Sequence, residues 1–231
     1  LGSGRVFQDI FVNRKKDGTL YYEEKTITPL KDASGRVTHF ISSGKDITER
    51  MQAEERLHRL AYHDVLTGLP NRALFMERLV HALSRRGRAR KLAVMFLDMD
   101  QFKTINDTLG HDVGDRLLQA FPERLAGCIR DSDTVARFGG DEFAILLEDV
   151  ASDEAVAQIA GKIIERLAKP FAVGSHELFV TISIGISLHP DDSGDVYTLL
   201  KHADSAMYRA KELGRNTYQF YSHEMSAKAY E

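Results

Sequence analysis

The sequence predicts an α/β protein of the α+β type, in which helices pack on a mixed β-sheet. Three observations support this fold class. Leu92–Leu97 is a short continuous apolar run, which is typical of a strand buried on both faces. Apolar residues recur at three- and four-residue spacing in several other segments, which is the pattern of amphipathic helices. Gly139-Gly140 separates two further strand-like segments and indicates a two-residue hairpin turn, because such turns need positive φ.

Residues 1–62 predict an antiparallel meander followed by a helix. The expected strands are Val6–Arg14, Leu20–Thr28 and Arg36–Ser43. The turns between them are Lys15–Gly18 and Asp32–Gly35. The second strand should end at Pro29. A meander of this size is marginally stable alone and needs a partner layer. Residues 47–62 should form a charged helix with a thin apolar seam, which either pairs with a copy of itself or is a solvated linker.

From about residue 63 onwards, helices and strands alternate. The expected helices run from Asn71 to about Ser84, and over Val113–Cys128, Ser152–Ala168 and Asp195–Leu213. The expected strands are Leu92–Leu97, the two strands joined by the glycine pair, Leu178–Leu188 and Asn216–Tyr221. Pro170 should stop one helix, and Gly214 should follow another at its C′ position. Pro122 lies inside a predicted helix and should kink it or remove a hydrogen bond.

The composition excludes several classes of function. A net charge of -3 and an isoelectric point near 6.3 give no basic field for nucleic acid. Cys128 is the only cysteine, so an internal disulfide and a cysteine-based metal cluster are excluded. A single cysteine fits a reducing setting, and a cytoplasmic location is expected. The sequence has no apolar run long enough to span a membrane and no signal peptide. The abrupt start at Leu1–Gly4 suggests a fragment of a longer protein, which could be membrane-anchored through missing N-terminal segments.

Two pairs of acidic residues stand at the ends of predicted strands. Asp98 and Asp100 follow the apolar run, and residues i and i+2 of a strand share a face. Asp141 and Glu142 follow the glycine pair directly. If the hairpin is antiparallel to the first strand, these acids come level with Asp98 and form an all-oxygen cluster suited to magnesium or manganese. The alternatives are acids that lie in separate places, or a solvated turn.

The polar segment after Asp100 could bind a nucleotide. Asn106 and Asp115 could together contact guanine, because a carboxylate accepts from the N1 and N2 hydrogens and an amide can donate to N3. Lys103 could stabilise phosphate charge. Lys211 and Arg215 lie four residues apart across a helix end and could bind phosphate oxygens, although such residues also simply favour the helix dipole.

These residues together resemble a GGDEF domain, that is, a diguanylate cyclase, over residues 63–221. The matching motifs, in the family's order, are Asp64–Arg72, Asp98-Met99-Asp100, the loop from Asn106 through His111 to Asp115, Gly139–Phe143, and Lys211 with Arg215. The resemblance implies a mixed sheet similar to that of nucleotidyl cyclases. It also implies the condensation of two GTP molecules into cyclic di-GMP with release of two pyrophosphates.

The resemblance implies a role for each matching residue. The metal ligands for Mg2+ or Mn2+ would be Asp98, the Met99 carbonyl, Asp141 and Glu142. The substrate-binding residues would be Phe102, Asn106, His111, Asp115, Gly139, Lys211 and Arg215. Asp141 would also help to deprotonate the ribose 3′-hydroxyl, and Lys103 would stabilise the transition state. Asp64 and Arg137 would pair structurally. Each domain would bind one GTP, so catalysis would need a homodimer.

Two further resemblances concern regulation. Arg130 and Asp133 fit the family's Arg-x-x-Asp inhibitory site for the product, and the alternative is a surface turn with one ion pair. Residues 1–46 resemble the C-terminal strands of a PAS domain, with Asp46-Ile47-Thr48 as its exit motif. The expected organisation is therefore a truncated PAS domain at 1–46, a signalling helix at 47–62, a cyclase domain at 63–224 and a tail at 225–231.

The leading hypothesis is an active, product-inhibited diguanylate cyclase. The first alternative is a catalytically silent GGDEF domain that acts as a receptor for GTP or cyclic di-GMP. The intact Gly139–Phe143 signature, Lys211 and Arg215 argue against it. A structural dimerisation module would not need Asp98, Asn106 and Asp115 together. A cyclase with relaxed base choice is a further alternative, but Asp115 favours guanine.

Overall fold

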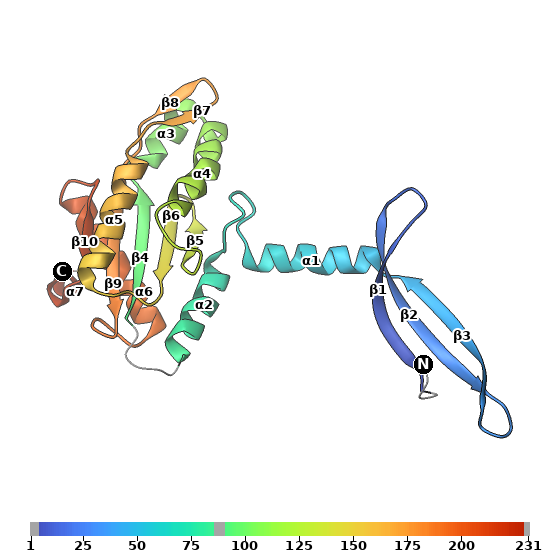
Figure 1. The fold of residues 1–231 in the computed structure, drawn as a ribbon. Helices are drawn as coiled ribbons and strands as arrows, with labels where there is room; N and C mark the ends of the chain where they lie inside the picture. The colour runs from blue at the N-terminus through green and yellow to red at the C-terminus, as the bar shows by residue number, and fades with distance from the viewer. Residues whose placement is uncertain (1–4, 86–90, 229–231) are drawn as a thin grey trace. The chain divides into compact units, whose positions relative to one another are not determined.

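The chain divides into two units, Leu1–Ala61 and Tyr62–Glu231. The structure is a computed structural model, and it describes residues 5–85 and 91–228 (Figure 1). The expectations for Leu1–Gly4 and for the last residues of the 225–231 tail lie outside the described residues.

The described part of the first unit is the expected antiparallel meander with a helix after it. Its strands, β1 (Phe7–Arg14), β2 (Leu20–Lys31) and β3 (Val37–Asp46), lie in the order β1-β2-β3, and α1 (Thr48–Tyr62) follows. One detail of the prediction is wrong, because β2 continues through Pro29 to Lys31. The last residue of β2 that pairs with β1 is Ile27, so Pro29 has a strand partner only on the β3 side. A residue without an N–H is tolerated at such an edge position.

The meander leaves most of its large apolar side chains exposed. Ile10 and Ile41, for example, are 48% and 55% exposed. Among the described residues of this unit, Ile47 is the only buried one. No element in the described part of this unit covers either face of the sheet. This agrees with the prediction that the meander needs a partner layer.

The described strands of the second unit form a mixed sheet in the order β10-β9-β4-β6-β5, together with a separate β7-β8 hairpin. The sheet strands are β4 (Leu92–Met99), β5 (Thr134–Gly139), β6 (Glu142–Leu147), β9 (Ile182–His189) and β10 (Tyr218–Phe220). β4 is the central strand and pairs antiparallel with both β6 and β9, whereas β10 pairs parallel with β9. The predicted mixed sheet is thus confirmed.

Helices cover both faces of this sheet (Figure 1). They are α2 (Arg72–Ser84), α4 (His111–Ala126), α5 (Asp153–Leu167) and α6 (Val196–Glu212). Met95 and Leu97 of β4 belong to the apolar core shared with α4 and α5, and Val94 and Phe96 belong to the core shared with α2 and α6. This alternation follows from the two-residue period of a strand. Asp98 follows Val94 and Phe96 at the same two-residue spacing, so it lies on the face of the sheet that α2 and α6 cover.

Some elements differ from the prediction. A helix, α3 (Phe102–Leu109), stands where a polar loop was expected. The predicted strand at 178–188 is instead the end of a short hairpin, β7 (Phe171–Val173) and β8 (His176–Leu178), followed by β9. Helix α7 (His223–Lys228) occupies part of the expected tail. α4 runs continuously past Pro122, which has no N–H and so leaves out one helical hydrogen bond, as expected. No helix among the described residues is both long and apolar enough to span a membrane.

Candidate active site

The register of β4 against β6 brings two carboxylates face to face. Asp98 pairs directly with Glu142, and the Met99 amide donates to the Asp141 carbonyl at 3.4 Å. The turn itself differs by one residue from the prediction. Gly139 ends β5 and pairs with Glu142, so the turn consists of Gly140 and Asp141. Both glycines have positive φ, 147° and 51°, as the prediction required. Asp141 thus lies at the turn and Glu142 lies on the strand.

Burial and like charges raise the pKa of both opposed acids. The pKa of Asp98 is raised mainly by burial and further by the charge of Asp141, although the Lys211 ammonium opposes this. Burial also raises the pKa of Glu142, and Asp98, Asp204 and Asp141 add repulsion. Like charges directly opposite each other destabilise a sheet. The cluster therefore has an excess of negative charge that the surrounding residues compensate only in part.

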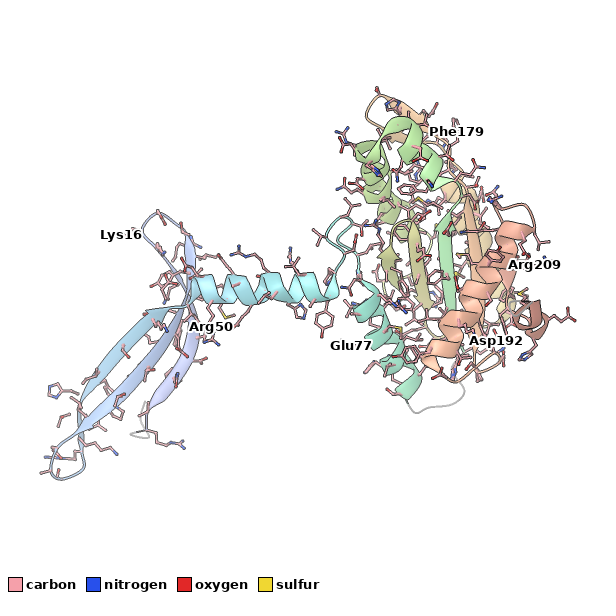
Figure 2. All side chains as sticks on the ribbon, turned by 180° about the vertical axis from the view of Figure 1, so that it is seen from behind. Lys16, Arg50, Glu77, Phe179, Asp192 and Arg209 are labelled. Carbon is pink, nitrogen blue, oxygen red and sulfur yellow. The ribbon has the colours of Figure 1, made fainter. Side chains whose placement is uncertain are left out.

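Lys211 reaches the cluster from the C-terminal end of α6, near Arg209, which is labelled in Figure 2. Its Nζ lies 2.8 Å from Oδ1 of Asp98. α6 packs closely on β9 because Gly185 has no side chain. A Cβ at Gly185 would lie 1.9 Å from the Ala203 carbonyl oxygen and 2.1 Å from the Met207 nitrogen. Gly185 therefore determines how close α6, and with it Lys211, comes to the sheet.

Asp204 belongs to this neighbourhood but was not predicted. It lies on α6, seven residues before Lys211, and two helical turns put both residues on one side of the helix. Desolvation raises the pKa of Asp204 and the Lys211 charge lowers it, although the side chain keeps exposed surface. The seven-residue spacing from Lys211 was the only signal in the sequence.

Asp100 has a different set of partners from Asp98. Its carboxylate accepts hydrogen bonds from the Thr181 hydroxyl at 2.6 Å, the Ser183 hydroxyl at 2.7 Å and the Asn216 amide at 3.1 Å. It is 6% exposed. Asp100 thus joins the end of β4 to the start of β9 and to the loop after α6, in which Arg215 lies. Its role in this structure is to hold these segments together.

The predicted nucleoside-binding residues lie on α3 and α4. Phe102 is buried and Asn106 is half-buried, whereas Lys103, His111 and Asp115 are exposed. Within the described residues, the side chains of Lys103, His111, Asp115 and Arg215 make no hydrogen bond or ion pair. Oδ1 of Asn106 is buried and has no hydrogen-bond partner among the described groups. These side chains remain available for a ligand.

Arg137 holds the turn that carries Asp141. Its Nη1 lies 2.9 Å from Oδ1 of Asp64, which confirms the predicted pair. Its Nε and Nη2 also donate to the Gly140 carbonyl, at 2.9 and 2.7 Å. Burial acts to raise the pKa of Asp64, but hydrogen bonds from Thr67 and Arg137 outweigh it and lower the pKa. The contact with Gly140 was not predicted, because an arginine can reach a backbone carbonyl from many positions.

Arg130 and Asp133 form a turn in this structure. Asp133 accepts from the Arg130 amide at 2.9 Å and from the Glu148 amide at 3.3 Å. Their side chains form no ion pair with each other in the described part of the chain, although one was expected in the alternative interpretation. The Arg130 side chain is exposed.

The acidic cluster fits a hard divalent cation by its chemistry. Asp98, Asp141 and Glu142 offer only oxygen donors. Burial, and then the charge of neighbouring carboxylates, raise the pKa of Asp98 and Glu142, and a cation would offset both effects. No preformed group of three or more possible metal ligands occurs among the residues that the structure describes. Mg2+ commonly binds through one or two carboxylates plus substrate phosphates, so a preformed cage is not required.

Comparison with known proteins identifies the family. The model of the diguanylate cyclase GGDEF domain matches residues 61–217. The chain therefore belongs to the GGDEF diguanylate cyclase family, and so to cyclic di-GMP signalling. It is 39% identical over 209 residues to the diguanylate cyclase TpbB of Pseudomonas aeruginosa, with 89% of this chain and 48% of that protein covered. It is 40% identical over 191 residues to the cyclic di-GMP phosphodiesterase PdeR of Escherichia coli, with 83% and 29% covered.

Solved structures agree with this assignment. The GGDEF domain of TpbB (YfiN) from Pseudomonas aeruginosa matches with a TM-score of 0.71 and 41% identity, covering 74% of this chain and 100% of that one. The coiled coil and GGDEF domain of DgcB from Caulobacter crescentus, in complex with c-di-GMP, matches with a TM-score of 0.65 and 28% identity, covering 74% and 92%. The chain spans 23% to 48% of the length of the curated relatives it matches.

Proposed function

We propose that this chain is an active diguanylate cyclase, which condenses two GTP molecules into cyclic di-GMP and releases two pyrophosphates. One observation carries the proposal. Asp98 lies opposite Glu142, next to the turn that holds Asp141, and burial and the charge of Asp141 raise the pKa of both opposed acids. A fold gains no stability from this arrangement, but a site that binds a cation and phosphates needs it.

The acidic residues of the site would bind the metal ions and accept a proton. Asp98, the Met99 carbonyl, Asp141 and Glu142 would hold Mg2+ or Mn2+, which would neutralise charge on the triphosphate. Asp141 would accept the proton of the ribose 3′-hydroxyl. The 3′-oxygen then bonds to the α-phosphorus of the second GTP, and the bond from that phosphorus to the pyrophosphate oxygen breaks. A second reaction of the same kind closes the ring.

Basic residues would bind the phosphates. Lys211 is bound to Asp98 in this structure and would share its charge with the triphosphate, together with Arg215. Lys103, exposed on α3, would stabilise the charge that develops on the leaving pyrophosphate. Because each domain binds one GTP, the reaction would need two chains face to face.

The base would bind at α3 and α4. Asn106 and Asp115 would contact guanine, and His111, Phe102 and Gly139 would complete the substrate site. The buried Oδ1 of Asn106, which has no partner in the described protein, supports this assignment, because a buried polar atom without a partner is costly unless a ligand satisfies it.

We also propose product inhibition at Arg130 and Asp133. The exposed Arg130 guanidinium could bind a phosphate of cyclic di-GMP, and Asp133 holds the turn that presents it. Arg130→Ala should raise the cyclic di-GMP concentration that halves the rate, without lowering the uninhibited rate. An unchanged inhibition curve would reduce this segment to a surface turn.

The proposed organisation follows the sequence. Residues 1–46 would be the C-terminal strands of a PAS domain, 47–62 a signalling helix, 63–224 the cyclase domain and 225–231 a tail. We propose a cytoplasmic site of action, because the substrate GTP is found there. A silent GGDEF receptor is the second candidate, and the similarity to a relative named as a phosphodiesterase favours it. The complete set of acidic and basic site residues in this chain favours the cyclase.

Comparing the wild type with Asp141→Ala tests the proposal. Both proteins are incubated with GTP and Mg2+, and the nucleotides are separated by chromatography. The wild type should form cyclic di-GMP, and Asp141→Ala should form none while it keeps its melting temperature. Glu177→Ala, which removes an exposed acid on β8, is the matched control and should keep full activity. Full activity in Asp141→Ala would refute the proposed mechanism.

A further inference from the structure

Asn106 has an unusual environment on the inner side of α3. Its Oδ1 is buried and has no hydrogen-bond partner among the described groups. An amide can present either its oxygen or its NH2 group in one direction by rotating about its terminal bond. A buried amide of this kind gains free energy when a ligand supplies the missing hydrogen bond.

Gly114 on α4 provides the space that this amide occupies. Gly114 is buried, and a Cβ at this position would lie 1.9 Å from Oδ1 and 3.0 Å from Cγ of Asn106. It would also lie 3.2 Å from Cζ of Phe102. Any residue other than glycine at 114 would therefore force the Asn106 side chain, and to a smaller extent the Phe102 ring, to move.

The backbone does not explain a glycine at this position. Gly114 lies inside α4, and it is not among the residues with positive φ. After proline, glycine is the least favourable residue in a helix interior. The helix thus carries an unfavourable residue at the point where it faces the Asn106 amide.

We propose that Gly114 is a positioning residue of the nucleotide site, which sets the Asn106 amide where it can bond to the edge of a guanine base. This inference rests on the proposed function, because it assumes that Asn106 contacts the base. Sites that hydrogen-bond a particular group reject analogues that lack it, because the buried partner is then left unpaired. Gly114 would therefore contribute to the choice of guanine over adenine without touching either base.

The experiment measures the affinity of the full chain for GTP and for ATP by titration calorimetry, with Ca2+ in place of Mg2+ to slow turnover. The variants are Gly114→Ala, Asn106→Ala and the double variant. Gly161→Ala is the matched control, because Gly161 also lies inside a helix and a Cβ there would meet nothing within 4 Å. Gly114→Ala should weaken GTP binding about tenfold or more, the equivalent of one lost hydrogen bond, and should lower the preference for GTP over ATP.

The double variant separates positioning from general packing. Once Asn106 is truncated, the main clash is gone and only the 3.2 Å approach to Cζ of Phe102 remains, so Gly114→Ala should cause little further loss of GTP affinity. If the double variant loses as much GTP binding free energy as the two single variants together, the inference is overturned. Wild-type affinity and selectivity in Gly114→Ala would overturn it too. If Gly114→Ala does not fold, a folded double variant with the affinity of Asn106→Ala supports the inference, and an unfolded one overturns it. A wild-type chain that binds no GTP would instead refute the proposed function.

Discussion

Asp98 and Glu142 oppose each other across β4 and β6 although both are acids, and this pair shows at the scale of the residue how the site is built. Burial and nearby carboxylates raise the pKa of both, and Lys211 relieves only Asp98 directly, at 2.8 Å. The pair therefore reduces the stability of the fold at neutral pH. A cation or a substrate complex would recover that free energy.

Replacing Glu142 by glutamine should therefore stabilise the protein while it abolishes turnover. Removing one of two opposed like charges is worth up to about 1 kcal/mol, which corresponds to a rise in melting temperature of about 2–4 °C in a unit of this size. The gain should be present at neutral pH and shrink as the pH falls through the raised pKa of Glu142, because the wild-type carboxyl is then protonated too.

Thermal unfolding of both proteins between neutral and acid pH measures this effect. Glu148→Gln serves as the control, because Glu148 is 3.4 Å from Arg85 and its neutralisation removes an attraction. A Glu142→Gln variant that is less stable than the wild type at neutral pH would show that the pair is not repulsive.

Asp64 should show the opposite pH dependence. Burial opposes its ionisation, but hydrogen bonds from Thr67 and Arg137 prevail and lower its pKa. Its contribution is therefore present above the unfolded-state pKa and is lost as the pH falls through the folded-state pKa. Asp64→Asn should cost about 1–3 kcal/mol at neutral pH, and less in acid. Urea unfolding at both pH values tests this.

A surface pair is the matched control for Asp64. Glu212 lies 2.8 Å from Arg209, but both side chains are more than a third exposed. Glu212→Gln should therefore change the free energy of unfolding by less than about 1 kcal/mol. If Asp64→Asn and Glu212→Gln lose the same free energy of unfolding, the Asp64–Arg137 pair does not hold the turn at Gly140.

Much of the acidic site could be predicted from individual residues. The pairing of Asp98 with Glu142 across two strands could be predicted from one apolar run and one glycine-based hairpin, because an antiparallel register leaves few alternatives. The role of Asp100 could not be predicted. Its partners Thr181, Ser183 and Asn216 are more than 80 residues away, and only the folded sheet brings them together.

At the scale of the element, α6 is positioned by the small residues of β9. Gly185 allows the helix backbone to approach the strand, and the Ser187 hydroxyl donates to the Leu199 carbonyl at 2.8 Å. A methyl group at Gly185 would meet backbone atoms of α6, which cannot rotate out of the way. The position of the whole helix, including Lys211, therefore depends on this glycine.

Gly185→Ala should lower both stability and activity. Overpacking of this kind typically costs about 1–3 kcal/mol, and the displaced helix should weaken GTP binding by moving Lys211. Gly194→Ala is the control, because a Cβ there would meet nothing within 4 Å. Chemical denaturation and GTP affinity measure the two effects. A Gly185→Ala variant with normal stability and affinity would contradict the close packing of α6 on β9.

The elements that the sequence did not predict are short or mostly polar. In α3, the apolar residues Phe102, Ile105 and Leu109 fall at helical spacing, but the residues between them are polar and suggested a loop. β7 and β8 have three residues each, which is too short for a periodic pattern. The longer elements, such as α2, α5 and α6, were predicted because their caps and apolar faces are evident in the sequence.

At the scale of the whole molecule, the two units differ in how they bury apolar surface. Both apolar cores of the described chain consist of residues from the second unit. The second unit, residues 62–231, should therefore fold alone with the melting temperature that it has in the full chain. We expect its cyclase activity to be lower, because we propose that the helix at 47–62 pairs with its copy, which is the first of the two alternatives given for this helix. Scanning calorimetry tests the first point, and loss of folding would contradict it. A rate measurement tests the second point, and a rate equal to that of the full chain would contradict it.

Conversion of GTP by the full chain over a range of protein concentrations tests whether this protein is a cyclase that works as a pair of chains. The chain is first freed of bound nucleotide and then supplied with GTP and Mg2+, and the products are identified by chromatography. We predict cyclic di-GMP with two pyrophosphates for each molecule formed, at a rate per chain that rises with concentration as chains pair. No cyclic di-GMP at any concentration would contradict the cyclase and favour the receptor.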